Sequence, residues 1–295
     1  MSGSHQHAGG RHRWRLGMSF ALVAAFFVVE LVVGLTSGSL ALLSDAGHMA
    51  ADVVTLGAAL VATKIATRAD STGRRTFGSY RAEVFASGLA VLLMIGVGVY
   101  IAVEAIGRIG GTPEVASGPM LVVGLLGLVV NVVALLLLRG GAGESLNVKG
   151  AYFEVVADTV GSVGVIVAAL LIGWTAQGWW DTVVAVAIAV FVLVRAFSLG
   201  REVLAVLGQH APSGVEPTQM LQALREVPAV TDVHDLHVWS LTSGMDVATA
   251  HLVTDGEPAA VLDAAARVLR ERFSIAHATL QVESPTNPAC QGADW

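Results

Sequence analysis

The sequence is poor in cysteine and in charge, and each shortage excludes a class of protein. The only cysteine is Cys290, so the chain has no internal disulfide and no cluster of thiolates for a metal. Charged residues are 14% of the 295 residues and hydrophobic residues are 54%, whereas soluble domains are about 25% charged. The net charge of −6 comes without the basic stripe that nucleic-acid binding needs. This composition is not that of an ordinary soluble protein.

The N-terminus imitates a secretory signal, because Arg11, Arg13 and Arg15 precede an apolar run. That run extends from Leu16 to about Leu35, which is too long for a signal core, and no small-residue cleavage site follows cleanly. We therefore expect a retained first transmembrane helix.

Apolar segments long enough to cross a bilayer, about 20 residues each, occur in six places. They lie near 16–36, 40–66, 82–107, 119–139, 148–173 and 179–200. The turn Thr36-Ser-Gly-Ser39 predicts that the first two segments form an antiparallel hairpin. We expect an α-helical membrane protein with six transmembrane helices.

The positive charges predict the orientation of these helices. They gather before the first helix and in every second connection: Arg11, Arg13, Arg15, Arg68, Arg74, Arg75, Arg81, Arg139, Lys149 and Arg201. The alternate connections, Gly110–Gly118 and Trp174–Gly178, contain no Lys or Arg. The positive-inside rule therefore places both termini in the cytosol of a multi-pass protein, which we expect in the plasma (inner) membrane.

After about Gly208 the pattern becomes that of a small α+β domain. Val215–Val227 and Pro258–Phe273 have helical periodicity, and three segments read as strands: Val230–Leu241, Met245–Thr254 and Ala276–Glu283. This order predicts a three-stranded sheet with helices on one face. About seventy residues make a marginal isolated core, so we expect this domain to pair with a second copy.

Ionisable residues inside the predicted spans mark a functional site. His48 and Asp52 lie four residues apart in the second span, and Glu154 and Asp158 lie four apart in the fifth. This spacing places each pair on one helix face. Together they offer one imidazole and three carboxylates, the number of ligands that a tetrahedral divalent cation needs. The alternative is a set of polar residues satisfied by interhelical hydrogen bonds.

Metal ions and protons would compete at these atoms, because three unpaired carboxylates in a low-dielectric site repel each other. That competition is the physical basis of an antiporter. Asp45 lies one turn outward from His48, and it is either a helix-start residue or a group on the access path. Glu30 either lines the cavity or pairs with a polar neighbour. Asn131 is expected to form a hydrogen bond between helices.

The histidines outside the spans form two further candidate groups. His234, His237, His251 and His277 lie on the predicted strands, with Glu283 at the end of the last one. Adjacent strands would bring two or three of these histidines close enough to bind zinc, with His237 the least favoured member, or they are ordinary surface residues. Strict alternation places His234 with Leu236 and Val238, and His237 on the other face. The N-terminal His5, His7 and His12 either collect metal or belong to a tail without a role.

Several segments resemble the cation diffusion facilitator family over nearly the whole chain. They are Ser39-Leu-Ala-Leu-Leu-Ser-Asp-Ala-Gly-His48 with Asp52, Thr76-Phe-Gly-Ser-Tyr-Arg-Ala-Glu83, Asn147-Val-Lys-Gly-Ala-Tyr152, Asp158-Thr-Val-Gly-Ser-Val163, and Val233-His-Asp-Leu-His-Val-Trp-Ser-Leu241. The last segment looks like the zinc-transporting branch. The resemblance implies a homodimer, metal-for-proton antiport by alternating access, and a metal-responsive cytosolic domain. Its expected segments are a tail at 1–15, a six-helix domain at 16–207, a ferredoxin-like domain at 208–285, and a tail at 286–295.

Glu154 departs from the zinc-transporting branch, which typically has histidine at this position. An all-oxygen pair on the fifth helix is harder and suits manganese, iron or cobalt better, with cadmium a further alternative. Zinc stays the first choice as substrate and regulatory ligand, because His48 retains the imidazole. Three carboxylates and one divalent ion leave the occupied site at −1 if His48 is neutral. We therefore hypothesise that Glu154 keeps or exchanges a proton, which Glu154→Gln would test through the pH dependence of transport.

Two functions of other classes compete with transport. A membrane-embedded metallohydrolase needs an open coordination position, a water and a general base. The sequence has neither a second paired metal cluster nor a nucleophilic Ser or Cys arrangement to support it. A membrane metal sensor would need a signalling output, and nothing in the last helix resembles one. Only a transporter moves stoichiometric metal across a sealed membrane, so flux separates the three.

Overall fold

A computed structural model describes residues 13–66, 76–78, 81–111, 113–139, 146–242 and 244–285. The chain divides into two compact units. The first comprises Met1–Val61 and Ala86–Gly200, and the second comprises Ala62–Phe85 and Arg201–Trp295.

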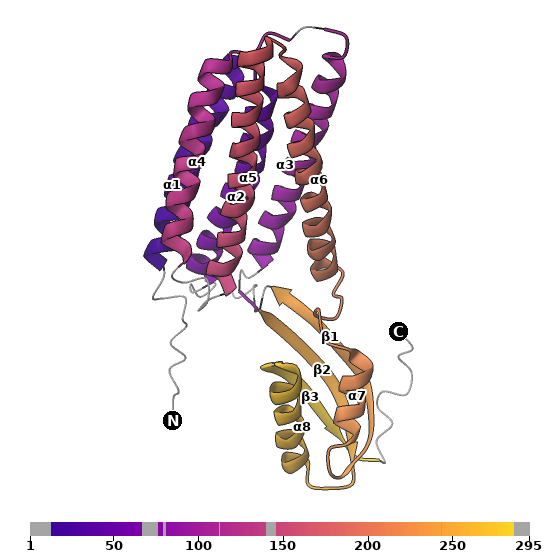
Figure 1. The fold of residues 1–295 in the computed structure, drawn as a ribbon. Coiled ribbons are helices and arrows are strands. Elements are labelled where there is room, and N and C mark those ends of the chain that lie inside the picture. Colours follow the sequence, from indigo (N-terminus) through magenta and orange to yellow (C-terminus); the bar gives the residue numbers. More distant parts are fainter. Residues whose placement is uncertain are drawn as a thin grey trace. The chain divides into compact units, whose positions relative to one another are not determined.

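The first unit is built from long helices that run side by side (Figure 1). They are α1 (Arg13–Ser37), α2 (Leu40–Ala66), α3 (Arg81–Gly107), α4 (Ser117–Arg139), α5 (Leu146–Thr175) and α6 (Trp179–Leu207). Among the described residues, five of them, all but α2, contain a segment long and apolar enough to cross a membrane. A helix suits that environment because it satisfies its own backbone polar groups. In α2 the polar residues Asp45, His48 and Asp52 interrupt the apolar run.

The core of the helical unit is continuous at one end and divided at the other. One end of the unit carries the connections at 38–39, 108–116 and 176–178, and we call it the turn end. There a single cluster joins all six helices, with Phe26, Met49, Ile101, Met120 and Val165 among its buried members. Toward the other end, the described residues form two separate clusters. Figure 1 shows α6 drawing away from α5 in that direction.

One of these two clusters joins α2, α3 and α6 through Ala51, Ala90, Met94, Val192 and Ala196. The other joins α4 and α5 through Ala134, Leu138 and Val155. We refer to this separation of α2, α3 and α6 from α4 and α5 as the fork. Asp52 follows Ala51 and Glu154 precedes Val155, so these two charged residues lie at the level of the fork, on helices of different clusters.

A buried carboxylate fixes the turn end. Asp181, at the start of α6, accepts hydrogen bonds from Ser39 Oγ at 2.6 Å and from the Leu40 and Ala41 amides at 2.7 and 3.1 Å. Arg108, the residue after α3, lies 3.3 Å from the same carboxylate and donates to the Gly38 carbonyl at 2.9 Å. Asp181 therefore caps the N-terminus of α2, whose first amides lack partners within their own helix.

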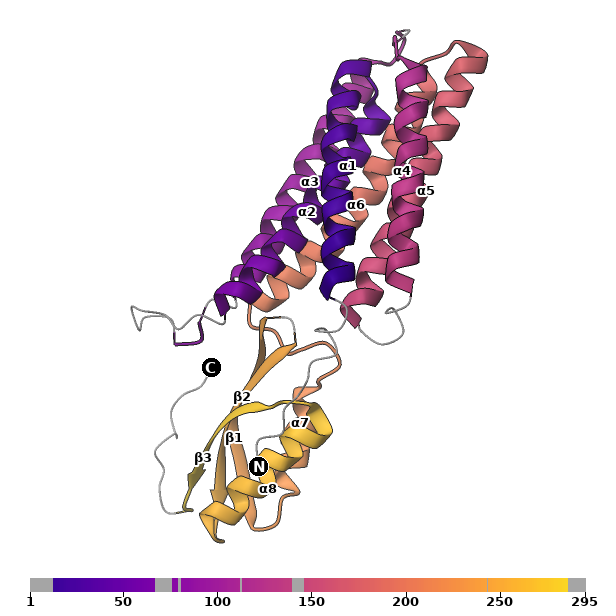
Figure 2. The same ribbon diagram turned by 90° about the vertical axis from the view of Figure 1, so that its left-hand side faces the viewer.

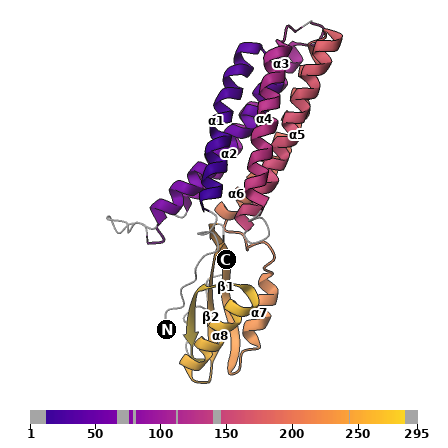
Figure 3. The ribbon, with the colours of Figure 1, turned by 60° about the vertical axis from the view of Figure 1, so that its left-hand side comes forward.

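The second unit follows the predicted order of helix, strand, strand, helix and strand. Its elements are α7 (Pro217–Arg225), β1 (Val230–Thr242), β2 (Met245–Thr254), α8 (Pro258–Phe273) and β3 (His277–Glu283). The sheet order is β1-β2-β3, with β1 antiparallel and β3 parallel to β2. Both helices lie on one side of the sheet (Figure 2). Figure 3 shows α8 on that side from another angle.

The face predicted for the second helix is the face that packs on the sheet. Val261, Ala265 and Leu269 are buried in the core of this unit, and Ala264 and Val268 pack against it. From the sheet, Ala248, Ala250 and Leu252 of β2 enter the same core. The opposite face of the sheet carries the histidines.

A β-bulge in β1 overturns the predicted alternation of its side chains. The register steps from the pair His234↔His251 to the pair His237↔Thr249, so one extra residue enters β1 between them. Asp235 has a φ of 51°, the left-handed conformation that aspartate tolerates better than most residues. His234 and His237 consequently lie on the same face of the sheet, and Leu236 and Val238 turn to the core.

Candidate metal centre

Three ionisable residues from α2 and α5 converge inside the helical unit. His48 Nε2 lies 3.7 Å from Asp52 Oδ2 and 3.5 Å from Asp158 Oδ1. All three residues offer ligand atoms that lie within 4.8 Å of one another. His48 and Asp158 are buried, and the Asp52 side chain is 16% exposed.

The local structure of α2 and α5 explains the convergence. Helical spacing places Asp52 one turn from His48 on the same face. Gly161 lets α5 approach α2, because a Cβ there would lie 2.7 Å from Asp45 Oδ1. Asn131 of α4 donates to Ser162 Oγ at 3.2 Å, which confirms the expected interhelical hydrogen bond and holds α5 from its other side.

The three side chains fit a divalent transition-metal ion. One imidazole nitrogen and two carboxylate oxygens are ligands that zinc and its neighbours accept. Asp158 Oδ1 and His48 Nδ1 are buried and have no hydrogen-bond partner in the described part of the chain. A buried carboxylate oxygen without a partner is costly, and a cation among these atoms would remove that cost. The assignment of these residues as ligands stays a prediction.

Glu154, the fourth predicted ligand, is engaged elsewhere. Both of its carboxylate oxygens accept from Arg195 of α6, the Oε1 contact being 2.6 Å from Nη2, and its side chain is 36% exposed. It therefore lies outside the group of three. Its role as a ligand stays a prediction.

Arg195 is the residue of this neighbourhood that the sequence analysis missed. Its Nη1 lies 3.1 Å from His48 Nε2, and Phe191, one turn earlier on α6, packs edge-on to the His48 ring. The signal was present, since Arg195 lies within the apolar segment 179–200, where an ionisable residue marks function by default. Arg195 also changes the predicted charge. With its positive charge included, the site holding one divalent ion is neutral rather than −1.

Asp45 and Glu30 form a second acidic pair beside this group. Both are buried, at 2% and 1% exposure, and their side chains lie next to each other. The structure thus excludes Asp45 as a surface residue at the start of α2, which begins at Leu40. It also gives Glu30 the polar neighbour that was one of its two predicted roles. Two buried carboxylates side by side repel each other when both are ionised, so this pair favours holding one proton.

A second candidate group lies on the open face of the sheet. His234, His251 and Glu283 offer ligand atoms within 4.8 Å of one another. His251 Nδ1 lies 3.0 Å from Glu283 Oε1, and His234 Nε2 lies 3.6 Å from Glu283 Oε2. Asp235, which the sequence analysis did not include, lies 3.7 Å from His251 Nε2 because the bulge redirects it.

His277 does not belong to this group, contrary to its inclusion in the predicted site. It pairs with Val247 at the first residue of β3, six residues before Glu283. At about 3.3 Å per residue, these two positions are about 20 Å apart along the strand. His237 is also outside the group and interacts with Asp235 at 2.9 Å.

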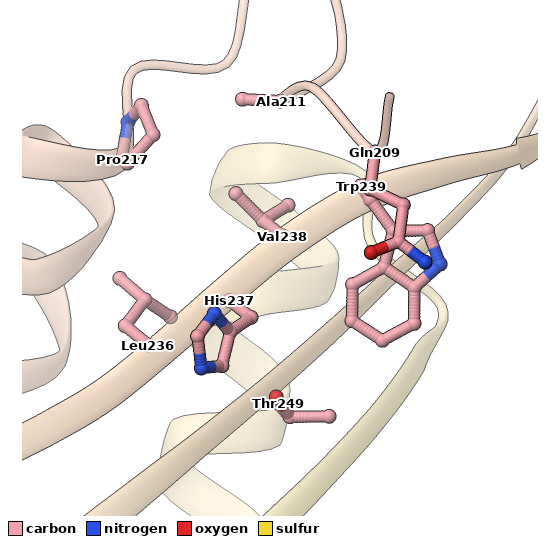
Figure 4. A pocket seen from close by; sticks show the side chains of 8 residues that line it. All are labelled: Gln209, Ala211, Pro217, Leu236, His237, Val238, Trp239 and Thr249. Atoms are coloured by element: carbon pink, nitrogen blue, oxygen red, sulfur yellow. The ribbon is translucent and has the colours of Figure 1, made fainter. Parts of the chain in front are cut away.

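His237 instead lines a pocket of about 500 Å³ together with Leu236, Trp239 and Thr249. Figure 4 shows its ring next to Thr249, with Trp239 further along the same strand. The N-terminal His5, His7 and His12 lie outside the described residues.

Comparison with known proteins places both units in one family. Residues 16–207 match the cation efflux transmembrane domain, and residues 212–285 match the cytoplasmic domain of cation efflux proteins. The chain is 41% identical to the metal cation efflux system protein CzcD of Cupriavidus metallidurans, over 99% of this chain and 92% of that protein.

Two further relatives agree with this assignment. The chain is 36% identical to a cadmium, cobalt and zinc/H(+)-K(+) antiporter of Bacillus velezensis, over 96% of this chain and 92% of the relative. It is 34% identical to the zinc transporter ZitB of Escherichia coli, over 100% and 95%. With the long apolar helices, these matches identify a multi-pass membrane protein and not an enzyme. The chain therefore belongs to the cation efflux, or cation diffusion facilitator, family and is a metal cation efflux transporter.

Proposed function

We propose that the protein exports divalent transition-metal ions, zinc first, from the cytosol in exchange for protons. The observation that carries this proposal is the buried group of His48, Asp52 and Asp158, whose ligand atoms converge within 4.8 Å. Its ligands come from two helices, so a small relative movement of α2 and α5 changes the geometry around the ion. A transporter needs such a site, because it must bind the ion on one side and release it on the other.

The proposal of proton exchange rests on the carboxylates. Protonation of Asp52 or Asp158 removes the lone pair and the charge that hold a cation, so protons and metal exclude each other there. The Glu30–Asp45 pair supplies a second proton-bearing group close by. The Bacillus velezensis relative is named as an antiporter that exchanges metal for protons and potassium.

The choice of zinc rests on the imidazole of His48 and on the zinc-transporting relatives. Cobalt and cadmium are the nearest alternatives, because one relative is named for all three metals. Manganese and iron remain alternatives if Glu154 joins the ion, since a harder oxygen-rich site favours them.

The proposed assembly is a homodimer in the plasma (inner) membrane with six spans and both termini in the cytosol. The sixth span is α2, whose 27 residues are long enough to cross a bilayer despite its polar residues. We also propose that His234, His251 and Glu283 bind metal as a regulatory site of the C-terminal domain.

Metal flux into sealed proteoliposomes under an imposed pH gradient tests the proposal. Zinc, cobalt, manganese and cadmium are compared, with Asp158→Ala as the site variant. Glu104→Gln, which removes a half-exposed carboxylate of α3, is the matched control. We expect zinc flux that depends on the gradient, disappears in Asp158→Ala and persists in Glu104→Gln. Tight binding of every metal without any flux would instead indicate a sensor.

A further inference from the structure

We infer that Arg195 is a tethered cation that occupies the transport site when no metal is bound and must leave His48 before metal can bind. The inference rests on the proposed function, because it takes His48, Asp52 and Asp158 as the ion's ligands. It assigns Arg195 as a residue that sets the affinity and selectivity of the site.

The guanidinium of Arg195 is held by a two-point contact. Nη2 donates to Glu154 Oε1 at 2.6 Å, and Nη1 donates to Glu154 Oε2. Such paired contacts fix the plane of the guanidinium and are stronger than single ones. Arg195 thus has a defined position, with Glu154 as its tether.

The same Nη1 reaches the proposed metal ligand. It lies 3.1 Å from His48 Nε2. Arginine has donors only, so in this contact Nε2 must accept through its lone pair. A metal ion coordinated by Nε2 uses that lone pair. The guanidinium and the metal therefore exclude each other at His48.

The surrounding charges strengthen this competition. Asp52 Oδ2 and Asp158 Oδ1 both face His48 Nε2, at 3.7 and 3.5 Å, so a cation near Nε2 is attracted by two carboxylates. In the metal-free site Arg195 supplies part of that positive charge. When a divalent ion enters, Arg195 is repelled, while its contact with Glu154 keeps it close enough to return.

A tethered competitor has a clear use in a transporter. A site with two carboxylate ligands, a third carboxylate nearby and no cation of its own would bind a divalent ion tightly and release it slowly. Arg195 lowers the affinity and assists release, because it reoccupies His48 as the ion leaves. Arg195 also sets a minimum affinity for the imidazole, since only an ion that binds His48 strongly can displace the guanidinium. In this assignment Glu154 is the tether of Arg195 rather than a permanent ligand.

Equilibrium titration of the purified full-length chain with Co²⁺ tests the inference. The parent protein for this titration carries His234→Ala and His251→Ala, as do all variants, so that the C-terminal group contributes no signal. We expect Arg195→Gln to bind Co²⁺ at least about tenfold more tightly than the parent, because one positive charge is lost next to the ion. Arg195→Lys keeps the charge but loses the two-point contact with Glu154, so its Co²⁺ affinity is expected to lie between those of the parent and Arg195→Gln.

Loss of the tether is expected to change the affinity for Co²⁺ in the opposite direction. Glu154→Gln leaves Arg195 at His48 with no carboxylate to withdraw to, and we expect Co²⁺ binding at least about tenfold weaker. Adding Arg195→Gln to this variant should recover binding. A purely structural role for Arg195 predicts the same or weaker binding in Arg195→Gln.

Three results would overturn the inference. The first is a folded Arg195→Gln that binds no more tightly than the parent. The second is an Arg195→Lys that binds as tightly as Arg195→Gln, and the third is a Glu154→Gln that binds more tightly than the parent. Tighter binding by Glu154→Gln would overturn the inference even if Arg195→Gln does not fold. Asp158→Asn separates the two proposals, because unchanged Co²⁺ binding in that variant would refute the metal site itself.

Discussion

At the scale of the residue, the Glu30–Asp45 pair is the clearest proton-bearing group beside the proposed metal site. Two buried carboxylates side by side favour one shared proton over two negative charges, and neither residue is among the three converging ligands. We expect Glu30→Gln to keep Co²⁺ binding but to lose at least about nine-tenths of gradient-driven flux. The amide keeps a donor to Asp45 but cannot exchange a proton.

Two measurements check this prediction, Co²⁺ titration in detergent and metal flux in proteoliposomes. Glu104→Gln serves as the control, because its carboxylate lies in α3 and contacts Arg108 at 3.6 Å. Full flux in Glu30→Gln would remove the pair from the transport cycle.

The C-terminal group offers a second prediction at this scale. We expect His251→Ala to lower the zinc bound per chain by one, because it removes the histidine 3.0 Å from Glu283. His237→Ala is the matched control from the same sheet face, since His237 contacts Asp235 and lies outside the group. Equilibrium dialysis of the full chain gives the count, and equal losses in both variants would contradict the assignment.

Some residue pairs of the site were predictable from the sequence, and others were not. The pairing of His48 with Asp52 follows from helical spacing alone, so it was predictable. The pairing of Glu154 with Arg195 depends on which helices are neighbours and how they are rotated. Nothing in the local pattern carries that information. The sequence could mark Arg195 as unusual, but it could not supply its partners.

At the scale of the element, the start of α2 depends on a carboxylate from α6. Asp181→Ala would leave Ser39, the Leu40 and Ala41 amides and Arg108 without their acceptor. Loss of one member of a buried charged network costs about 3–5 kcal/mol. We expect the thermal unfolding midpoint in detergent to fall by roughly 10 °C.

Glu104→Gln again provides the comparison, because Glu104 contacts the same arginine from a side chain that is 46% exposed. An exposed pair contributes about 1 kcal/mol or less. Similar midpoints for Asp181→Ala and the wild type would show that the cap does not stabilise the turn end.

Most helices and strands were predictable from the sequence, but the bulge in β1 was not. Pro258–Phe273 and Met245–Thr254 match the observed α8 and β2, because apolar periodicity reports the buried face. The bulge at Asp235 was not predictable, since alternation counts residues and a bulge adds one. It decides which histidines share a face, so the predicted placement of His234 was wrong.

At the scale of the whole molecule, the orientation in the membrane has a convenient probe in the single cysteine. Cys290 lies in the C-terminal tail, which we place in the cytosol. A membrane-impermeant maleimide should label it only after cells are permeabilised. With Cys290 replaced by Ser, Ile109→Cys in the 108–116 connection should be labelled in intact cells, because that connection is placed outside. Labelling of Cys290 in intact cells would invert the proposed topology.

Hydropathy predicted six long helices and most of their limits, although α6 continues past the predicted end near 200 to Leu207. It did not predict how the helices share a core. The apolar residues of all six helices look alike in the sequence. Only packing shows that one cluster joins them at the turn end, while α2, α3 and α6 separate from α4 and α5 beyond it. The position of the charged residues along this division was therefore beyond prediction.

The fork has a consequence for the surrounding lipid. The Glu154–Arg195 ion pair joins α5 to α6, and these two helices border different clusters there. Because the proposed metal ligands come from α2 and α5, on the two sides of the fork, the width of the fork and the affinity for metal are thermodynamically linked, and the link acts in both directions. Lateral pressure that narrows this half of the bundle would change metal affinity, and bound metal would change the resistance to that pressure. The thickness and tension of the bilayer thus become effectors of the metal site.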